Sequence, residues 1–193
     1  MFTMSMYSWI LLLHVTTAIL LIGNAIVGWH VRAAIGAASS PAAVGTLLDV
    51  FRRAAHASPL LAIIVLTTGV YLGSYGWWSQ PWFAVAIGLW ILQATLSAKG
   101  IRAHVSALSA AVHTGNATIT PEAEAIRRSS SWLAISAVMR GNDFSLAYLM
   151  FNKPSLRESL ALVLFTAILA LLAEMGLERL RRVRRVAVHY TSA

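Results

Sequence analysis

Long apolar stretches without charge constrain this chain more than any other feature of its sequence. The first of them, residues 7–31, holds no lysine, arginine, aspartate or glutamate. About 20 consecutive apolar residues suffice for a helix to cross the hydrocarbon core of a bilayer. Of the 193 residues, 58% are apolar and 11% are charged, whereas roughly a quarter of a typical soluble domain is charged. We therefore predict an all-α integral membrane protein.

Five segments are long and apolar enough to be spans. The fourth is ambiguous, because the charged residues Arg140 and Asp143 interrupt it. Polar or basic connections separate the segments, and we read residues 32–53 and 99–128 as loops. The predicted spans cover residues 7–31, 54–75, 82–98, 131–151 and 156–177. Residues 1–154 then form a four-span unit, to which residues 155–193 add one span and a basic tail.

The placement of basic residues resolves the ambiguity of the fourth segment. If residues 131–151 span the membrane, both long loops and the tail lie on one side and carry 12 of the 15 lysines and arginines. Cytoplasmic loops of membrane proteins carry this excess. We therefore predict a bundle of five transmembrane helices with the N-terminus outside and the C-terminus inside. The expected partners are the lipid bilayer and anionic lipid head groups at the tail, and not nucleic acid.

A resemblance to a known family covers residues 7–154. The residues that carry it are Leu13-His14-Val15, Gly23 to Gly28, Thr68-Gly69, Trp90 with Ser97, and Leu149 to Pro154. In this order they resemble a bacterial family of four-span membrane proteins of unknown function, loosely related to the membrane domain of copper-resistance protein D and to HemJ-type proteins. The resemblance implies the bacterial inner (cytoplasmic) membrane, and a link to haem, porphyrin or copper. Residues 155–193 are an addition to the family pattern.

Polar side chains within the spans are candidate functional residues, because intramembrane polar groups are costly and usually face the bundle interior. His14 and Asn24 share one face of the first span, and Arg140 and Asp143 share one face of the fourth. Counted at about 1.5 Å per residue, His14 and Asp143 lie at similar depths and should meet. Asn24, Gln93 and Arg140 should form a layer nearer the cytoplasm. We expect no other polar residue in the spans to compete with these five.

Each candidate has two interpretations. His14 is either an interhelical hydrogen-bond donor or a haem ligand. Arg140 and Asp143 either neutralise each other, or Arg140 holds an anionic ligand group while Asp143 orients His14. Asn24 and Gln93 either line a cofactor site or join helix pairs.

Three histidines mark a second candidate site at the cytoplasmic rim. His30 ends the first span, His56 begins the second and His104 follows the third. Three imidazoles at one level can bind copper, zinc or a haem edge. Interfacial histidines are common, however, and neither a carboxylate nor a cysteine accompanies these three, because the chain has no cysteine at all.

Three functions remain open from the sequence. The first is electron transfer, with haem b or a quinone held between the first, third and fourth spans. The second is an accessory subunit that packs against other membrane subunits without catalysis. The third is transport of copper or a small solute, although the chain lacks the Met and Cys ladder expected for copper. The chain shows no catalytic signature, so we do not predict an enzyme.

Overall fold

The computed structural model describes residues 5–112 and 118–191, and the side chains up to residue 179 except that of residue 178. These ranges contain helices and no strand, as the all-α prediction requires. In chain order the elements are α1 (Met6–Ala37), α2 (Pro41–His56), α3 (Ser58–Gly73), α4 (Pro81–Thr95), the π-helix η1 (Leu96–Ile101), α5 (Arg102–Val112), α6 (Pro121–Arg127), α7 (Ser130–Asn152) and α8 (Leu156–Thr191).

Prolines and capping serines set the helix boundaries. The Ser40 side chain accepts a hydrogen bond from the backbone N–H of Ala43, and Pro41 occupies the first turn of α2. Pro59 breaks the rod between α2 and α3, because it lacks an N–H and tolerates only the first turn of a helix. Pro81 opens α4 in the same way. The α4–η1–α5 rod has no such break and runs on to Val112.

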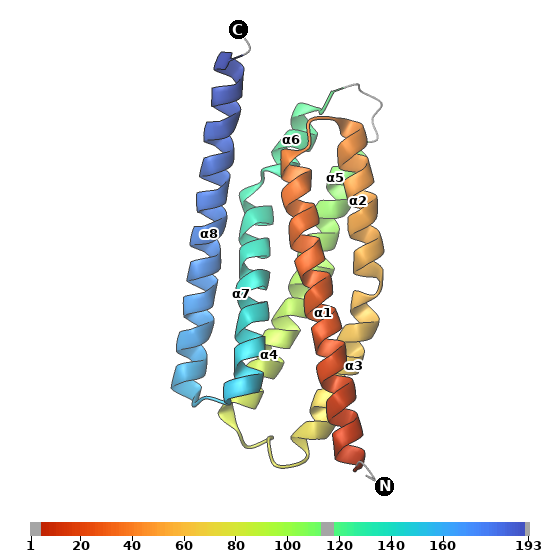
Figure 1. Ribbon diagram of the computed structural model, residues 1–193, viewed down its shortest axis with the longest axis vertical. Coiled ribbons are helices and arrows are strands. Elements are labelled where there is room, and N and C mark those ends of the chain that lie inside the picture. Colours follow the sequence, from red (N-terminus) through yellow and green to blue (C-terminus); the bar gives the residue numbers. More distant parts are fainter. Residues whose placement is uncertain (1–4, 113–117, 192–193) are drawn as a thin grey trace.

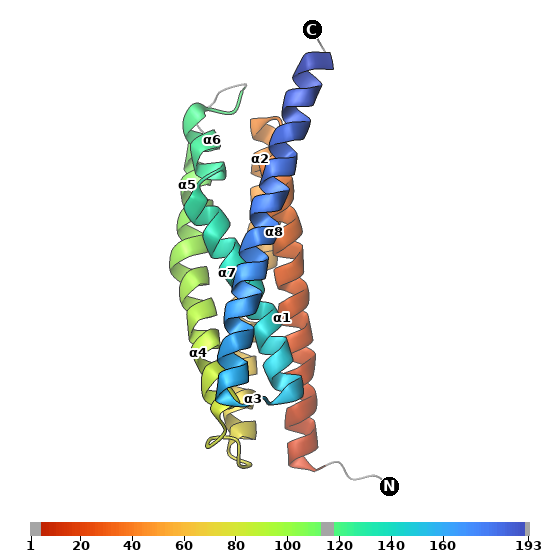
Figure 2. The same ribbon diagram turned by 90° about the vertical axis from the view of Figure 1, so that its left-hand side faces the viewer.

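The helices form one bundle in which α8 is the outermost element. Figures 1 and 2 show α8 alongside α7, with the N-terminus and C-terminus at opposite ends of the molecule. Helix α7 packs against α8 on one side and α4 on the other, while α1 packs against α2 and α3. Helix α7 is therefore the element that joins α8 to the rest of the bundle.

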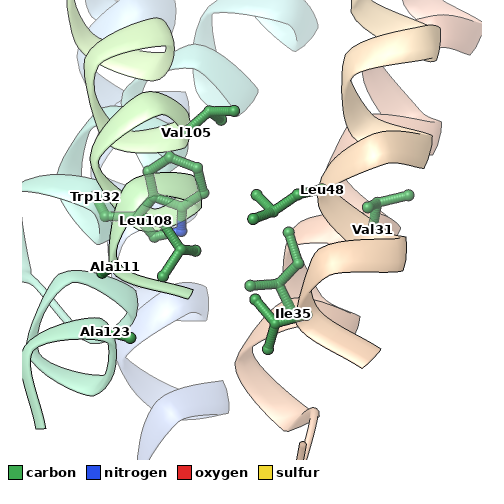
Figure 3. Packing of buried hydrophobic residues seen from close by; sticks show 9 residues of the cluster. Val31, Ile35, Leu48, Val105, Leu108, Ala111, Ala123 and Trp132 are labelled. Carbon is green, nitrogen blue, oxygen red and sulfur yellow. The ribbon is translucent and has the colours of Figure 1, made fainter. Parts of the chain in front are cut away.

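Two apolar cores lie towards opposite ends of the bundle. The larger joins α1, α2, α5, α6 and α7, and its side chains point toward one another in Figure 3. The smaller is centred on Trp82 and Phe83 of α4 and includes Leu149 of α7. Large apolar side chains are exposed along the outer faces of the helices, among them Ile19 and Leu164 at 64% each. These faces fit a lipid environment rather than water.

Within the part of the chain that the structure describes, four helices or runs of consecutive helices are long and apolar enough to cross a membrane. They are Met6–Ala37, Pro41–Gly73, Pro81–Val112 and Leu156–Leu177. Helix α7 forms where a fourth span was predicted, but it is not among the four. Its charged and amide side chains lower its mean hydropathy. The sequence therefore identified the helix correctly, whereas its role as a fifth span is not established by hydropathy.

The two predicted loops are largely helical, which corrects the sequence interpretation. Residues 41–56 form α2, and η1 and α5 continue α4 from Leu96 to Val112. These segments look like loops because they are rich in Ala, Ser and basic residues. They fold as helices because Val44 and Leu48 of α2 meet Leu108 of α5 in the larger core.

The contact between α7 and α8 depends on a glycine. A Cβ added at Gly141 would lie 2.8 Å from the Thr166 backbone oxygen, so any side chain there forces the backbones apart. One turn away, the hydroxyl groups of Ser145 and Thr166 form a 2.6 Å hydrogen bond. Small residues at such positions allow close helix approach within membranes.

We predict that Gly141→Ala destabilises the protein by about 1–3 kcal/mol, the usual range for overpacking. Gly176→Ala is the matched control on α8, because a Cβ there meets nothing within 4 Å. Thermal unfolding in detergent should show a lower Tm for Gly141→Ala only. Equal Tm values for the two variants would mean that the backbones are not in close contact.

Candidate functional site

The most deeply buried charge that the structure describes is a carboxylate of α8. Glu174 is 3% exposed and pairs with arginines from two other helices. Its Oε2 accepts a 2.5 Å hydrogen bond from Nη2 of Arg32 in α1. Its Oε1 pairs with Nη2 of Arg140 in α7. Glu174 therefore links α1, α7 and α8 at a single point.

An aromatic side chain completes the surroundings of Arg140. The guanidinium carbon of Arg140 lies 5.2 Å from the centre of the Trp29 ring, within cation–π range. Phe144 packs beside Trp29, with ring centres 6.1 Å apart. Arg140 is thus held by a carboxylate at its tip and by an aromatic face, both supplied by other helices.

A second polar cluster joins α4 to α7 through the Gln93 amide. Its Nε2 donates to Asp143 Oδ1 over 2.8 Å, and its Oε1 accepts from Asn142 Nδ2 over 2.8 Å. Asn142 Nδ2 also donates to the backbone oxygen of Leu89 over 3.0 Å. Gln93 and Asp143, which were both predicted as site residues but not as a pair, are therefore in direct contact, and both side chains face the inside of the bundle.

Three buried polar atoms of α7 in these clusters lack a hydrogen-bond partner. They are Nε of Arg140, which is a donor, and Oδ1 of Asn142 and Oδ2 of Asp143, which are acceptors. Buried polar groups are nearly always paired. Orphaned atoms on three residues within one helical turn therefore mark this part of α7 as the best candidate site among the described residues.

His14 does not contact Asp143, contrary to the sequence-based expectation. Its Nδ1 lies 2.9 Å from Thr68 Oγ1 of α3. The Thr68 hydroxyl already donates to the Ile64 backbone oxygen, so His14 Nδ1–H is the donor. The ring packs on Gly69, where an added Cβ would lie 3.2 Å from His14 Cε1. The depths counted from the sequence match, but His14 bonds to α3 and Asp143 bonds to α4.

Asn24 also lies apart from Gln93 and Arg140, so the predicted layer of three is not formed. Its Nδ2 donates to the Ala54 backbone oxygen and to Ser58 Oγ, both at 2.6 Å. These acceptors flank the break between α2 and α3. Asn24 therefore joins helices at a proline-induced break, as its packing interpretation proposed.

Sequence reasoning missed Glu174, Arg32 and Asn142. Glu174 lies inside the predicted span 156–177 and is the most costly residue there, so counting charges in each span would have found it. Arg32 was assigned to a loop, and Asn142 was treated as part of an interruption. The expectation that no other polar residue competes was wrong.

The three rim histidines do not assemble a metal site. His30 Nδ1 donates to the Ile26 backbone oxygen at 2.9 Å. His104 Nδ1 donates to the Gly100 backbone oxygen at 3.0 Å, and its Nε2 accepts from the hydroxyl groups of Ser131 and Ser129. Within the described part of the chain, no three His, Cys, Asp or Glu side chains, those of His30, His56 and His104 included, are grouped so that they could hold a metal ion.

Comparison of the chain with protein-family models, with curated proteins and with solved structures finds no match in any of the three. The resemblance to the four-span bacterial family therefore stays a prediction.

We predict that Glu174→Gln destabilises the protein by about 3–5 kcal/mol, because breaking a buried ion pair leaves an uncompensated charge. Glu158→Gln is the matched control, because Glu158 lies on the same helix but is exposed. The free energy of unfolding of the two variants in detergent gives the comparison. Similar losses would mean that Glu174 does not link the three helices.

Proposed function

We propose that this chain is a five-span integral membrane protein that binds and releases a proton at Asp143, inside its helical bundle. The single observation that carries the proposal is a buried carboxylate with one oxygen bonded to Gln93 and the other without a donor. Ionisable residues inside membrane bundles commonly belong to proton or ion pathways.

The fifth span of this proposal is α7. Its 23 residues extend about 35 Å at 1.5 Å per residue, enough for a hydrocarbon core of about 30 Å. Helices α4 and α8 cover its two sides, and Arg140 and Asp143 point to groups on those helices rather than to lipid. Five spans also place most basic residues on the cytoplasmic side.

A topology experiment tests this arrangement. A reporter inserted after Arg128 should report the cytoplasm, and one inserted after Asn152 should report the outside of the cell, because α7 alone separates the two positions. If both reporters lie on the same side, α7 does not cross the membrane and five spans are excluded.

Counting donors and acceptors favours a proton on Asp143. Asp143 Oδ2 is a buried acceptor without a donor. A proton on Oδ2 converts this acceptor into a hydroxyl group, so that no donor has to reach it. It also removes a buried negative charge, whose desolvation otherwise costs several kcal/mol.

The charged groups near Asp143 lie on the side from which a proton can enter. Arg140 precedes Asp143 in α7, whose first residues lie towards the end of the bundle that holds the α8 C-terminus (Figure 1), and Glu174 joins Arg140 to Arg32. In the proposed topology this end is cytoplasmic. A proton from the cytoplasm therefore meets charged and polar side chains before it reaches Asp143.

Infrared spectroscopy tests the protonation of Asp143 directly. Protein in lipid nanodiscs at low pH should show the carbonyl band of a protonated carboxylic acid shielded from water, and the band should disappear as the pH rises. Asp143→Asn should remove the band, and Glu158→Gln should retain it. A wild-type spectrum without the band at every pH where the protein is folded would overturn the proposal.

A second candidate function rests on His14. Because Nδ1 donates to Thr68, Nε2 keeps the lone pair that a ligating histidine uses. A haem or quinone at this point fits His14. It does not fit the expectation that Arg140 holds an anionic group of the ligand, because Arg140 pairs with Glu174 of the same chain. Haem b, electron transfer, the accessory-subunit role and solute transport stay predictions, and of these only cofactor binding is favoured by a specific contact.

A further inference from the structure

We infer that Arg140 is exchanged between Glu174 and Asp143, so that the protonation state of Asp143 sets how firmly α8 is held against the bundle. The inference rests on the proposed function, because it uses the proton on Asp143. It assigns to Arg140 the role of moving between two carboxylates, which neither a fixed ion pair nor a proton site alone requires.

The first arrangement is the one present in the structure. Arg140 Nη2 pairs with Glu174, and Asp143 is bonded to Gln93 alone. This pair matters for α8 because residues 167–177 are otherwise weakly covered. Ala170 and Glu174 are the only buried residues in that stretch, so the ion pairs of Glu174 are its main polar attachment.

In the second arrangement Arg140 pairs with Asp143. A buried donor and a buried acceptor that both lack a hydrogen-bond partner indicate it. Arg140 Nε is a buried donor without an acceptor, and Asp143 Oδ2 is a buried acceptor without a donor. Residues three apart on a helix have Cβ atoms roughly 5–6 Å apart, so their side chains can meet without movement of the backbone. An ionised Asp143 thus has a partner ready on its own helix.

The charge on Asp143 decides between the two arrangements. A neutral Asp143 does not compete for the guanidinium, which stays on Glu174. An ionised Asp143 attracts the Arg140 guanidinium, and as Nε turns towards Asp143 Oδ2 the pairing of Nη2 with Glu174 weakens. Loss of the Asp143 proton therefore weakens the attachment of α8.

The other charged groups around Asp143 do not alter the conclusion that loss of its proton weakens the attachment of α8. Among the described residues, α7 contributes Arg140, α8 contributes Glu174 and α1 contributes Arg32. Helix α4 contributes the neutral Gln93. Glu174 and Asp143 are thus the two described carboxylates between which Arg140 is exchanged, so the exchange has two end states.

Spin-label distances test the inference on the full chain in nanodiscs. The protein has no native cysteine, so labels can be placed at Val27→Cys of α1 and Leu172→Cys of α8, which are 46% and 60% exposed. We expect a narrow distance distribution at low pH and a broader one, shifted to longer distances, at high pH.

Three variants distinguish the possible causes. Asp143→Asn should keep the narrow distribution at every pH, because a neutral side chain cannot draw Arg140 away. Glu174→Gln should give the broad distribution at every pH, and Glu158→Gln should behave as the wild type. If Glu174→Gln does not fold, the comparison of Asp143→Asn with the wild type still decides whether the charge on Asp143 controls the label distances.

The two proposals can fail separately. If the infrared band of Asp143 responds to pH but the label distances do not, Asp143 is a proton site without this coupling, and the inference is wrong. If the distances respond to pH equally in Asp143→Asn, another group controls α8 and the inference is again wrong. If the infrared band of protonated Asp143 is absent, the proposed function is wrong, and the inference that rests on it is wrong as well.

Discussion

The cost of burying a carboxylate governs how the outer helix of this protein is held. Glu174 lies at 3% exposure, and an ionised carboxylate in such a place is tolerated only with close positive partners. Arg32 and Arg140 provide them from α1 and α7. The charge requirement therefore brings α1 together with α7 and α8, which lie far from it in the sequence, and it does so towards the end of the bundle that also holds the larger apolar core.

Polar groups also join the other helices, through hydrogen bonds rather than ion pairs. His14 bonds to Thr68, Asn24 to the break at Ser58, and Ser145 to Thr166. Lipid is as apolar as the helices themselves, so apolar burial alone does not decide which helix faces meet in a membrane, and polar pairs and small residues do. The cluster of Gln93, Asn142 and Asp143 differs because it leaves acceptors without donors.

Much of the architecture was predictable because its signals are local. Hydropathy and length predicted the helices of residues 7–31, 54–75 and 156–177, and the helix at 131–151 was found despite its charges. The helical nature of residues 41–53 and 102–112 was missed, because their apolar residues are covered by each other and not by lipid. The composition of a short segment does not reveal a packing partner that lies far along the chain, as Leu108 does from Leu48.

The candidate site was predictable only in part. Gln93, Arg140 and Asp143 were identified because polar residues inside a span are rare and costly. Their partners were not, since depth along a helix can be counted from sequence but the direction in which a face points within a bundle cannot. His14 and Asp143 illustrate this, because their depths counted from the sequence match while their hydrogen-bond partners lie on different helices.

The sequence by itself determined that the chain is helical, that its outer faces are apolar and which of its segments carry polar groups at depth, because these properties depend on neighbours within a few turns. Only the tertiary structure decided that Arg140 meets Glu174, that Asp143 meets Gln93 and that His14 turns to Thr68. Such pairings depend on the rotation and close approach of whole helices, at places such as Gly141, and no local pattern encodes them.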